Sequence, residues 1–179
     1  MDGFYSEKKM MKSGFRKIER DDLNELKLLK YESYEVTHGM FNSNDEEQTK
    51  WFQVISDSKN DTPMIYEDEG EKIGFYYIRE IDWISRHHNF SYYVFPQHRG
   101  KGFGSVILNK GLQYSFDRLN MNKVYAHVLS TNKISLKLMT SVGFYPVGVL
   151  KNHVFKNGMY IDDNILEITK DIHINNKEG

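Results

Sequence analysis

Three glycines stand at alternate positions in the stretch QHRGKGFGS, where Gly100, Gly102 and Gly104 separate an extended segment from a helical one. Residues 85–96 alternate like a β-strand that ends at a proline, and from residue 101 onward apolar side chains recur with helical spacing. Glycine is unfavourable inside either element, because it loses the most backbone freedom on folding. The sequence therefore predicts a strand, a glycine-rich turn and the N-terminus of a long helix in succession.

A turn of this kind is a typical anion site. The first amides of a helix have no partner within the helix, the helix dipole favours negative charge, and glycine lets a phosphate approach the backbone. A Walker loop does not fit, because it requires Lys and then Ser or Thr after its last glycine, whereas Gly104 precedes Ser105 and Val106. A dinucleotide-binding turn does not fit either, because it requires G-x-G-x-x-G and an acidic residue after the next strand, which here ends VLSTN.

Composition limits the remaining choices. The 179 residues, of which 39% are hydrophobic and 27% charged, suit one globular domain with its own core. The formal net charge of -1 offers no broad field for nucleic acid or an anionic membrane, so we expect neither as a partner. Without cysteine, a signal peptide or a long apolar run, a cytoplasmic location is expected. The histidines show no metal-ligand spacing, and no metal is predicted.

The rest of the chain alternates strands and helices. We expect a flexible leader over residues 1–13, a single domain over 14–170 and a tail over 171–179, of which residues 175–179 are frayed. The further elements expected are a strand at 15–18, a helix at 19–35 capped by Asp21, a helix at 43–58 capped by Asn44 or Ser43, two strands within 62–84, a strand at 123–129, a helix at 132–142 capped by Asn132 and a closing hairpin within 143–169.

The segment VFPQHRGKGFGSVIL resembles the pyrophosphate loop of the Gcn5-related N-acetyltransferases (GNAT), whose pattern Gln/Arg-x-x-Gly-x-Gly/Ala is matched by Arg99, Gly102 and Gly104. Downstream, VYAHVLSTNKISLKLMTSVGF is similar to the following strand, asparagine-capped helix and Gly-Phe pair of that family, and EKIGFYYIREID is similar to its central hairpin. The resemblance runs from Phe15 to Ile168. It implies a single α/β (α+β) domain, with a twisted mixed sheet of six or seven strands flanked by about four helices.

The resemblance also implies acetyl-CoA as the acyl donor. In the family, loop amides hold the pyrophosphate, the preceding strand pairs with the pantetheine arm, and an asparagine at the next helix contacts the cofactor. The corresponding cofactor-binding residues here are Arg99, Gly100, Lys101, Gly102, Phe103, Gly104 and Ser105 in the loop, Tyr92, Tyr93 and Val94 on the strand, and Asn132.

Proton handling departs from the family pattern. Many members of the branch that this chain resembles carry a glutamate at the position of Asn89. They also carry, at the position of Met139, a tyrosine that protonates the leaving thiolate. Neither group can be transferred to this chain. Glu80, Tyr93 and His127 are the candidate catalytic residues, because a carboxylate, phenol or imidazole can relay a proton. We also expect the reaction to proceed without a side-chain general acid.

The acceptor is expected to be a primary amine of a small molecule, since the closing hairpin and the segment IDWISRHHNFSYYVFP resemble spermidine, ribosomal-protein N-terminal and amino-sugar-nucleotide acetyltransferases. A polyamine would favour acidic groups, and an amino-sugar nucleotide would favour basic and aromatic groups such as His38 and Arg79. The expected substrate-binding residues are Glu35, Trp51, Glu80 and Trp83. A protein N-terminal or side-chain acetyltransferase and an acyl-CoA-binding sensor without turnover are the alternatives, and homo-oligomerisation stays open.

Overall fold

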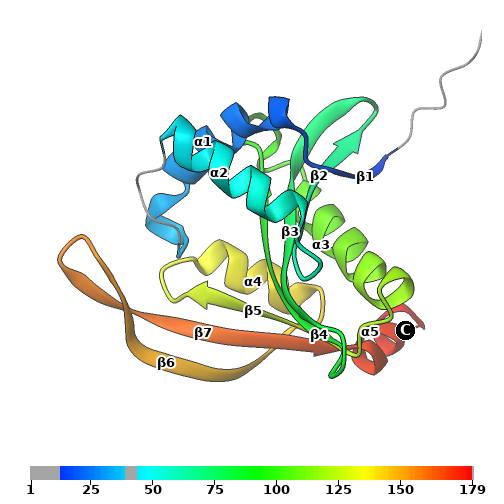
Figure 1. Ribbon diagram of the computed structural model, residues 1–179. Helices are drawn as coiled ribbons and strands as arrows, with labels where there is room; N and C mark the ends of the chain where they lie inside the picture. The colour runs from blue at the N-terminus through cyan, green and yellow to red at the C-terminus, as the bar shows by residue number, and fades with distance from the viewer. Residues whose placement is uncertain (1–12, 39–43, 179) are drawn as a thin grey trace, which may run out of the picture.

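The computed structural model describes residues 13–38 and 44–178, which form a seven-stranded mixed sheet in the order β1-β2-β3-β4-β5-β7-β6 (Figure 1). The strands are β1 (Gly14–Lys17), β2 (Thr62–Asp68), β3 (Glu71–Asp82), β4 (His87–Val94), β5 (Lys123–Leu129), β6 (Tyr145–Lys156) and β7 (Met159–Thr169). The helices are α1 (Leu23–Glu32), α2 (Asp45–Ser56), α3 (Phe103–Gln113), α4 (Lys133–Ser141) and α5 (Lys170–Glu178). Shorter turns of helix are η1 (Arg20–Asp22), η2 (Tyr34–Val36), η3 (Pro96–His98) and the π-helical η4 (Tyr114–Arg118). The α/β class and the mixed sheet predicted from the sequence are confirmed.

Two apolar layers hold the sheet. On one side, α1 and α2 pack on the β2–β4 region through residues that include Leu26, Ile55 and Phe75. On the other side, α3 covers the same strands through Ile107 and neighbouring residues (Figure 1). Because side chains alternate along a strand, each strand contributes one row to each layer. Residues two positions apart on a strand therefore have their side chains on the same face of the sheet.

The parallel pair of β4 and β5 is short. His87, His88 and Asn89 pair with residues 123–125, and beyond this point the two strands part (Figure 1). On its other edge β4 stays paired with β3 as far as Val94, and β5 stays paired with β7 along its whole length. The second half of β4 therefore has no strand partner on the side of β5 within the described chain.

Helix starts follow the predicted caps in two cases. Asn44 caps α2, with its Oδ1 atom accepting a hydrogen bond of 2.8 Å from the amide of Glu47, and Asn132 caps α4. The expectation that Asp21 caps the first helix is wrong, because Asp22 precedes α1 and its carboxylate accepts from the amide of Glu19. Asp22, which forms ion pairs with Arg16 and Lys72, is the residue that directly precedes α1, where Asp21 was expected.

The start of the predicted tail is helical and packed. Residues 170–178 form α5, and the ring of His173 lies 5.1 Å from that of Phe116, with His173 only 4% exposed. Ile172 packs against the main core, so the tail gains tertiary contacts that its polar composition did not indicate. The predicted leader, 1–13, lies outside the described residues except for its last position. No helix in the described ranges is long and apolar enough to cross a membrane.

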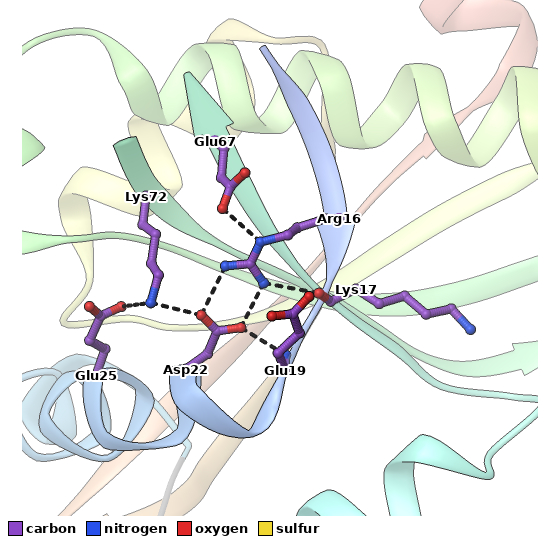
Figure 2. A network of polar contacts seen from close by, with 7 residues as sticks. All are labelled: Arg16, Lys17, Glu19, Asp22, Glu25, Glu67 and Lys72. Carbon is purple, nitrogen blue, oxygen red and sulfur yellow. Dashed lines mark hydrogen bonds and ion pairs between the residues drawn. The ribbon is translucent and has the colours of Figure 1, made fainter. Parts of the chain in front are cut away.

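A buried carboxylate joins the first strand and helix to the sheet (Figure 2). Asp22, whose side chain is 1% exposed, lies 2.7 Å from Arg16 of β1 and 2.9 Å from Lys72 of β3. Each cation also reaches a second carboxylate, Glu67 at 2.6 Å from Arg16 and Glu25 at 3.2 Å from Lys72. Burial by itself would raise the pKa of Asp22, but hydrogen bonds from Arg16 and Lys72 outweigh it and hold that pKa well below its usual range.

Replacing Asp22 by Asn should destabilise the fold by about 3 kcal/mol, because two partly buried cations lose their shared anion. Urea unfolding at pH 7 would measure the change. The exposed neighbour offers a matched control, since Asp21→Asn removes the same charge and should change stability by no more than about 0.5 kcal/mol.

The effect has a defined pH dependence. The folded state lowers the pKa of Asp22 below its unfolded value of about 3.9, so the stabilisation is present above that value and is lost as the pH falls further. The stability difference between wild type and Asp22→Asn should therefore narrow below about pH 4. A difference that stayed constant from pH 7 into acid would contradict this account.

Candidate active site

The glycine-rich turn presents a row of free amides at the start of α3. Gly100 and Gly102 have positive φ angles of 74° and 84°, and a Cβ atom built on either would meet no atom within 4 Å. Within the described residues, no carbonyl or side-chain oxygen accepts a hydrogen bond from the amides of residues 100–104. The turn thus combines an open approach with unpaired N–H groups and the positive end of a helix dipole, which is the physical requirement for an anion site.

Gly104 has a different role from the other two glycines. A Cβ atom at this position would lie 2.7 Å from Cδ2 of Leu138 in α4 and 3.9 Å from Cγ2 of Val94. The missing side chain therefore allows α3 and α4 to pack closely. A side chain at position 104 is excluded by Leu138 and not by a phosphate.

Arg99 ties the turn to the end of β4. Its Nε atom donates a 3.1 Å hydrogen bond to the carbonyl of Val94, and its Nη2 atom lies 3.6 Å from Glu32 of α1. Lys101 is exposed on the same turn. Arg99 thus holds the loop against the strand, and Lys101 is the cation that faces solvent.

Asn132 links the start of α4 to η2. Its Oδ1 atom accepts from the amide of Ser135 at 3.1 Å, and its Nδ2 atom donates to the carbonyl of Val36 at 3.1 Å. Ser135 Oγ lies 3.2 Å from the hydroxyl of Tyr92 on β4. Both polar groups of Asn132 are thus engaged within the chain, where they fix the start of α4 against η2.

Met139, the residue where the resembling branch carries a tyrosine, is 1% exposed and packs in the main apolar core. The flexible thioether side chain fills space in this core, as methionine commonly does.

A polar row crosses the sheet at the point where β4 and β5 part. Arg79 pairs with Asn89, and Asn89 pairs with Tyr125, so the three side chains share the face that carries α1 and α2. The Nε atom of Arg79 and the Oδ1 atom of Asn89 are buried and have no hydrogen-bond partner among the described residues. Buried polar atoms are normally paired, so both atoms are available to a bound molecule.

Glu80 lies beside this row in an unusual conformation. Its φ angle is 57°, at an irregularity in the pairing of β3 with β4. The exposed carboxylate accepts a 3.3 Å hydrogen bond from the hydroxyl of Tyr125. A positive φ at a residue other than glycine is costly and is often found at functional sites.

His127 lies two residues beyond Tyr125 on the same face of β5 and contacts a buried carboxylate. Its Nδ1 atom lies 2.7 Å from Oδ2 of Asp163 on β7, and Nε2 of His38 lies 3.0 Å from the other oxygen, Oδ1. Asp163 is a residue that the sequence analysis missed. The signal available was the pair Asp162–Asp163 inside a strand, but which of the two points inward depends on the register of β7 against β5.

Tyr93, a candidate for proton transfer, lies on the α1–α2 side of β4 and stacks on Phe75 with ring centroids 6.2 Å apart. Burial raises its pKa, although Arg79 and hydrogen bonding with Thr37 and Ser33 partly oppose the rise. A phenol with a raised pKa remains protonated near neutral pH, so Tyr93 is unsuited to accept a proton.

The other predicted acceptor residues are dispersed. Glu35 accepts hydrogen bonds from Nδ2 of Asn157, in the turn of the β6–β7 hairpin, at 2.9 and 2.7 Å. Trp51 packs edge-on to Tyr77 with ring centroids 6.0 Å apart, and Trp83 donates to Asn60 at 3.1 Å. Of the predicted substrate residues, Glu80 is the one that joins the polar row.

Among the described residues, no cluster of three or more His, Asp and Glu side chains has metal-binding geometry.

The role assigned to Gly104 can be tested by coupling. Gly104→Ala forces its methyl group against Leu138, so truncation of Leu138 to Ala should cost less in that background than in the wild type, by about 0.5–3 kcal/mol. Denaturant unfolding of the two single variants and the double variant measures this difference. Gly148→Ala is the control, because its methyl group would meet no atom within 4 Å. Strictly additive costs for Gly104 and Leu138 would contradict the packing role.

Comparison with known proteins identifies the family. Residues 15–165 match the model of the acetyltransferase (GNAT) domain. The spermidine N(1)-acetyltransferase of Vibrio cholerae is 30% identical over 148 residues, covering 83% of this chain and 80% of that protein, and the Escherichia coli K12 enzyme of the same name is 26% identical over 152 residues, covering 81% and 79%. A crystal structure of the spermidine N-acetyltransferase from Vibrio cholerae, in complex with CoA and spermine, superposes with a TM-score of 0.86 at 27% identity, covering 90% of this chain and 98% of that one. The chain therefore belongs to the GNAT family and is an N-acetyltransferase.

Proposed function

We propose that this protein transfers the acetyl group of acetyl-CoA to a primary amine of a small molecule. One arrangement carries the proposal. Within the described residues, the amides of the turn at 100–104 lack acceptors, and the turn directly follows the half of β4 that has no strand partner on the side of β5. An anion site beside an unpaired strand edge suits a ligand with a diphosphate at one end and an amide-containing arm at the other. CoA has both groups.

The loop and the strand would bind different parts of CoA. The amides of residues 100–104 would hold the pyrophosphate, with Lys101 adding a charge from solvent, while the amides of Arg99 and Ser105 already donate to the carbonyls of Pro96 and Gly102. The backbone of Tyr92, Tyr93 and Val94 would pair with the pantetheine arm as an added strand would. The carbonyl of Val94 already accepts from Arg99, so the pairing would use the other peptide groups of this stretch.

The acceptor we favour is a polyamine. Relatives named spermidine N(1)-acetyltransferase cover about four-fifths of the chain. Glu80 supports this choice, because its exposed carboxylate lies at the point where β4 and β5 part and has Tyr125 as its hydrogen-bond donor. A carboxylate in this position could hold a distal ammonium group of the acceptor while another amine reacts.

A second acceptor class is favoured by a separate observation. The buried Nε atom of Arg79 and the buried Oδ1 atom of Asn89 lack partners in the described chain, and together they offer one donor and one acceptor. A hydroxylated or anionic acceptor, such as an amino-sugar nucleotide, would satisfy both atoms, whereas a polyamine would satisfy the acceptor alone.

An amine panel separates these possibilities. We expect free thiol to be released from acetyl-CoA with spermidine or spermine, with kcat/KM at least about tenfold higher than with an amino-sugar nucleotide or a peptide amine. Glu80→Gln should lower kcat/KM for spermidine by about tenfold, which corresponds to the loss of one charge-assisted contact. The control Glu46→Gln, on the exposed start of α2, should leave it unchanged.

The other outcomes are informative. Preference for the amino-sugar nucleotide would select the second class, and preference for the peptide would select a protein acetyltransferase. Calorimetric binding of CoA with no thiol release for any amine would show a binding module and would overturn the proposed activity.

The pH dependence tests the expectation that no side chain protonates the leaving thiolate. The value of kcat should rise with pH and then stay level to about pH 10, because Met139 has no proton to donate and a thiol of pKa about 8.5 leaves readily as thiolate. Tyr92 is the phenol beside α4 whose removal checks this, and Tyr92→Phe should keep kcat within about twofold. A descending limb, or a large loss in Tyr92→Phe with the fold intact, would reveal a general acid.

A further inference from the structure

Asp163 is a buried carboxylate held between two imidazoles that come from distant parts of the sequence. Its side chain is 1% exposed, yet it contacts His127 of β5 at 2.7 Å and His38, which follows η2, at 3.0 Å. A buried carboxylate needs hydrogen-bond donors, and Nδ1 of His127 donates to Oδ2, whereas Nε2 of His38 lies near Oδ1 without hydrogen-bond geometry. The hydrogen bond from Nδ1 therefore defines the orientation of the His127 ring.

The contact with Asp163 also selects the tautomer of His127. A carboxylate can only accept, so the proton of the neutral ring lies on Nδ1 and the lone pair lies on Nε2. Within the described residues, Nε2 of His127 has no hydrogen-bond partner, and the side chain is 29% exposed. The ring thus presents an unoccupied proton acceptor toward solvent.

The position of this nitrogen relative to the strands is informative. Pairing of β4 with β5 ends at Asn89 and Tyr125, and His127 is the next residue of β5 on the face of Tyr125. The imidazole therefore borders the place where the strands part, on the side that also carries Arg79 and Glu80. An acetyl group delivered along β4 and an amine entering from the α1–α2 side would meet beside it.

Other groups near this position are less suited to take a proton. Asn89 has an amide, which is not basic, and burial raises the pKa of Tyr93. The carboxylate of Glu80 already accepts from Tyr125. The titratable groups that contact His127 are Asp163, His38 and Tyr125. Glu80 is bonded to Tyr125, and the charge of Arg79 acts on His38. Burial lowers the pKa of His38, which keeps its ring neutral beside the carboxylate.

We propose that His127 is the general base of the acetyl transfer and that Asp163, with His38 on its second oxygen, is its positioning residue. The proposal rests on the proposed function. The proton of the acceptor amine moves to Nε2 of His127 while the amine nitrogen bonds to the thioester carbon. The C–S bond then breaks, and CoA leaves as the thiolate. The imidazolium returns its proton to solvent and the thiolate takes a proton from water, so the products are the acetylated amine and CoA thiol.

The first test removes the base. His127→Gln should lower kcat by about 10²–10⁴-fold, the usual contribution of general base catalysis, while KM for acetyl-CoA stays within about twofold. Added imidazole should restore part of the lost rate, which it would not do if the ring were needed only for packing. His153→Gln, on the exposed part of the β6–β7 hairpin, is the matched control and should behave as wild type.

The second test addresses the positioning residue. Asp163→Asn replaces an acceptor by an amide that can donate to Nδ1, which would place the ring proton on Nε2 and block the base. We expect kcat to fall at least about tenfold with CoA affinity unchanged, and Asp163→Glu to recover part of the loss. Melting curves would show that each variant is folded.

The outcomes distinguish this inference from the proposed function. Turnover by wild type together with a kcat for His127→Gln within about threefold of wild type would overturn the inference and leave the function standing. Failure of imidazole to raise the rate of a folded, impaired His127→Gln protein would also overturn it. A wild-type protein that releases no thiol with any amine would overturn the function itself.

Discussion

The early parting of β4 and β5 is the constraint on which the rest of the site depends. Each strand is held by its other neighbour, since β4 continues along β3 to Val94 and β5 continues along β7 to Leu129. The parallel pairing therefore ends after three residues on each strand, and the free half of β4 leads directly into the glycine-rich turn. Peptide groups that would otherwise be consumed by the sheet are left for a ligand, and His127 gains an open side. A longer parallel ladder would abolish all of these features together.

The connection between α1 and α2 is assembled over the site by contacts from the C-terminal half of the chain. Four contacts hold the segment 34–38: Lys156 with Tyr34, Asn157 with Glu35, Asn132 with Val36, and Asp163 with His38. These contacts come from the α4 cap, the β6–β7 hairpin turn and β7. The position of residues 34–38 therefore depends on the hairpin as well as on the helices. Glu35, which the sequence suggested as a substrate ligand, serves this connection.

Local patterns predicted much of the fold. The glycine spacing between an alternating and a helical segment located the turn, and the asparagines at positions 44 and 132 located two helix starts, because capping is decided by a residue and its next three neighbours. The reason inferred for Gly104 was incomplete, since its neighbour Leu138 is distant in sequence. The contact between His173 and Phe116 is likewise not visible in the polar composition of residues 170–178.

The sequence by itself determined the order of strands and helices, the glycine-rich turn and the absence of the glutamate and tyrosine that the resembling branch carries, since each of these is a matter of residue type and short spacing. Only the tertiary structure decided which side chains meet. Asp163 rather than Asp162 faces His127 because the β5–β7 register places Asp163 opposite Leu129, and a shift of one residue would turn it to the other face. His38, which contacts the same carboxylate, is distant from Asp163 in the sequence. Such contacts depend on strand register and on long-range packing, which no local pattern specifies.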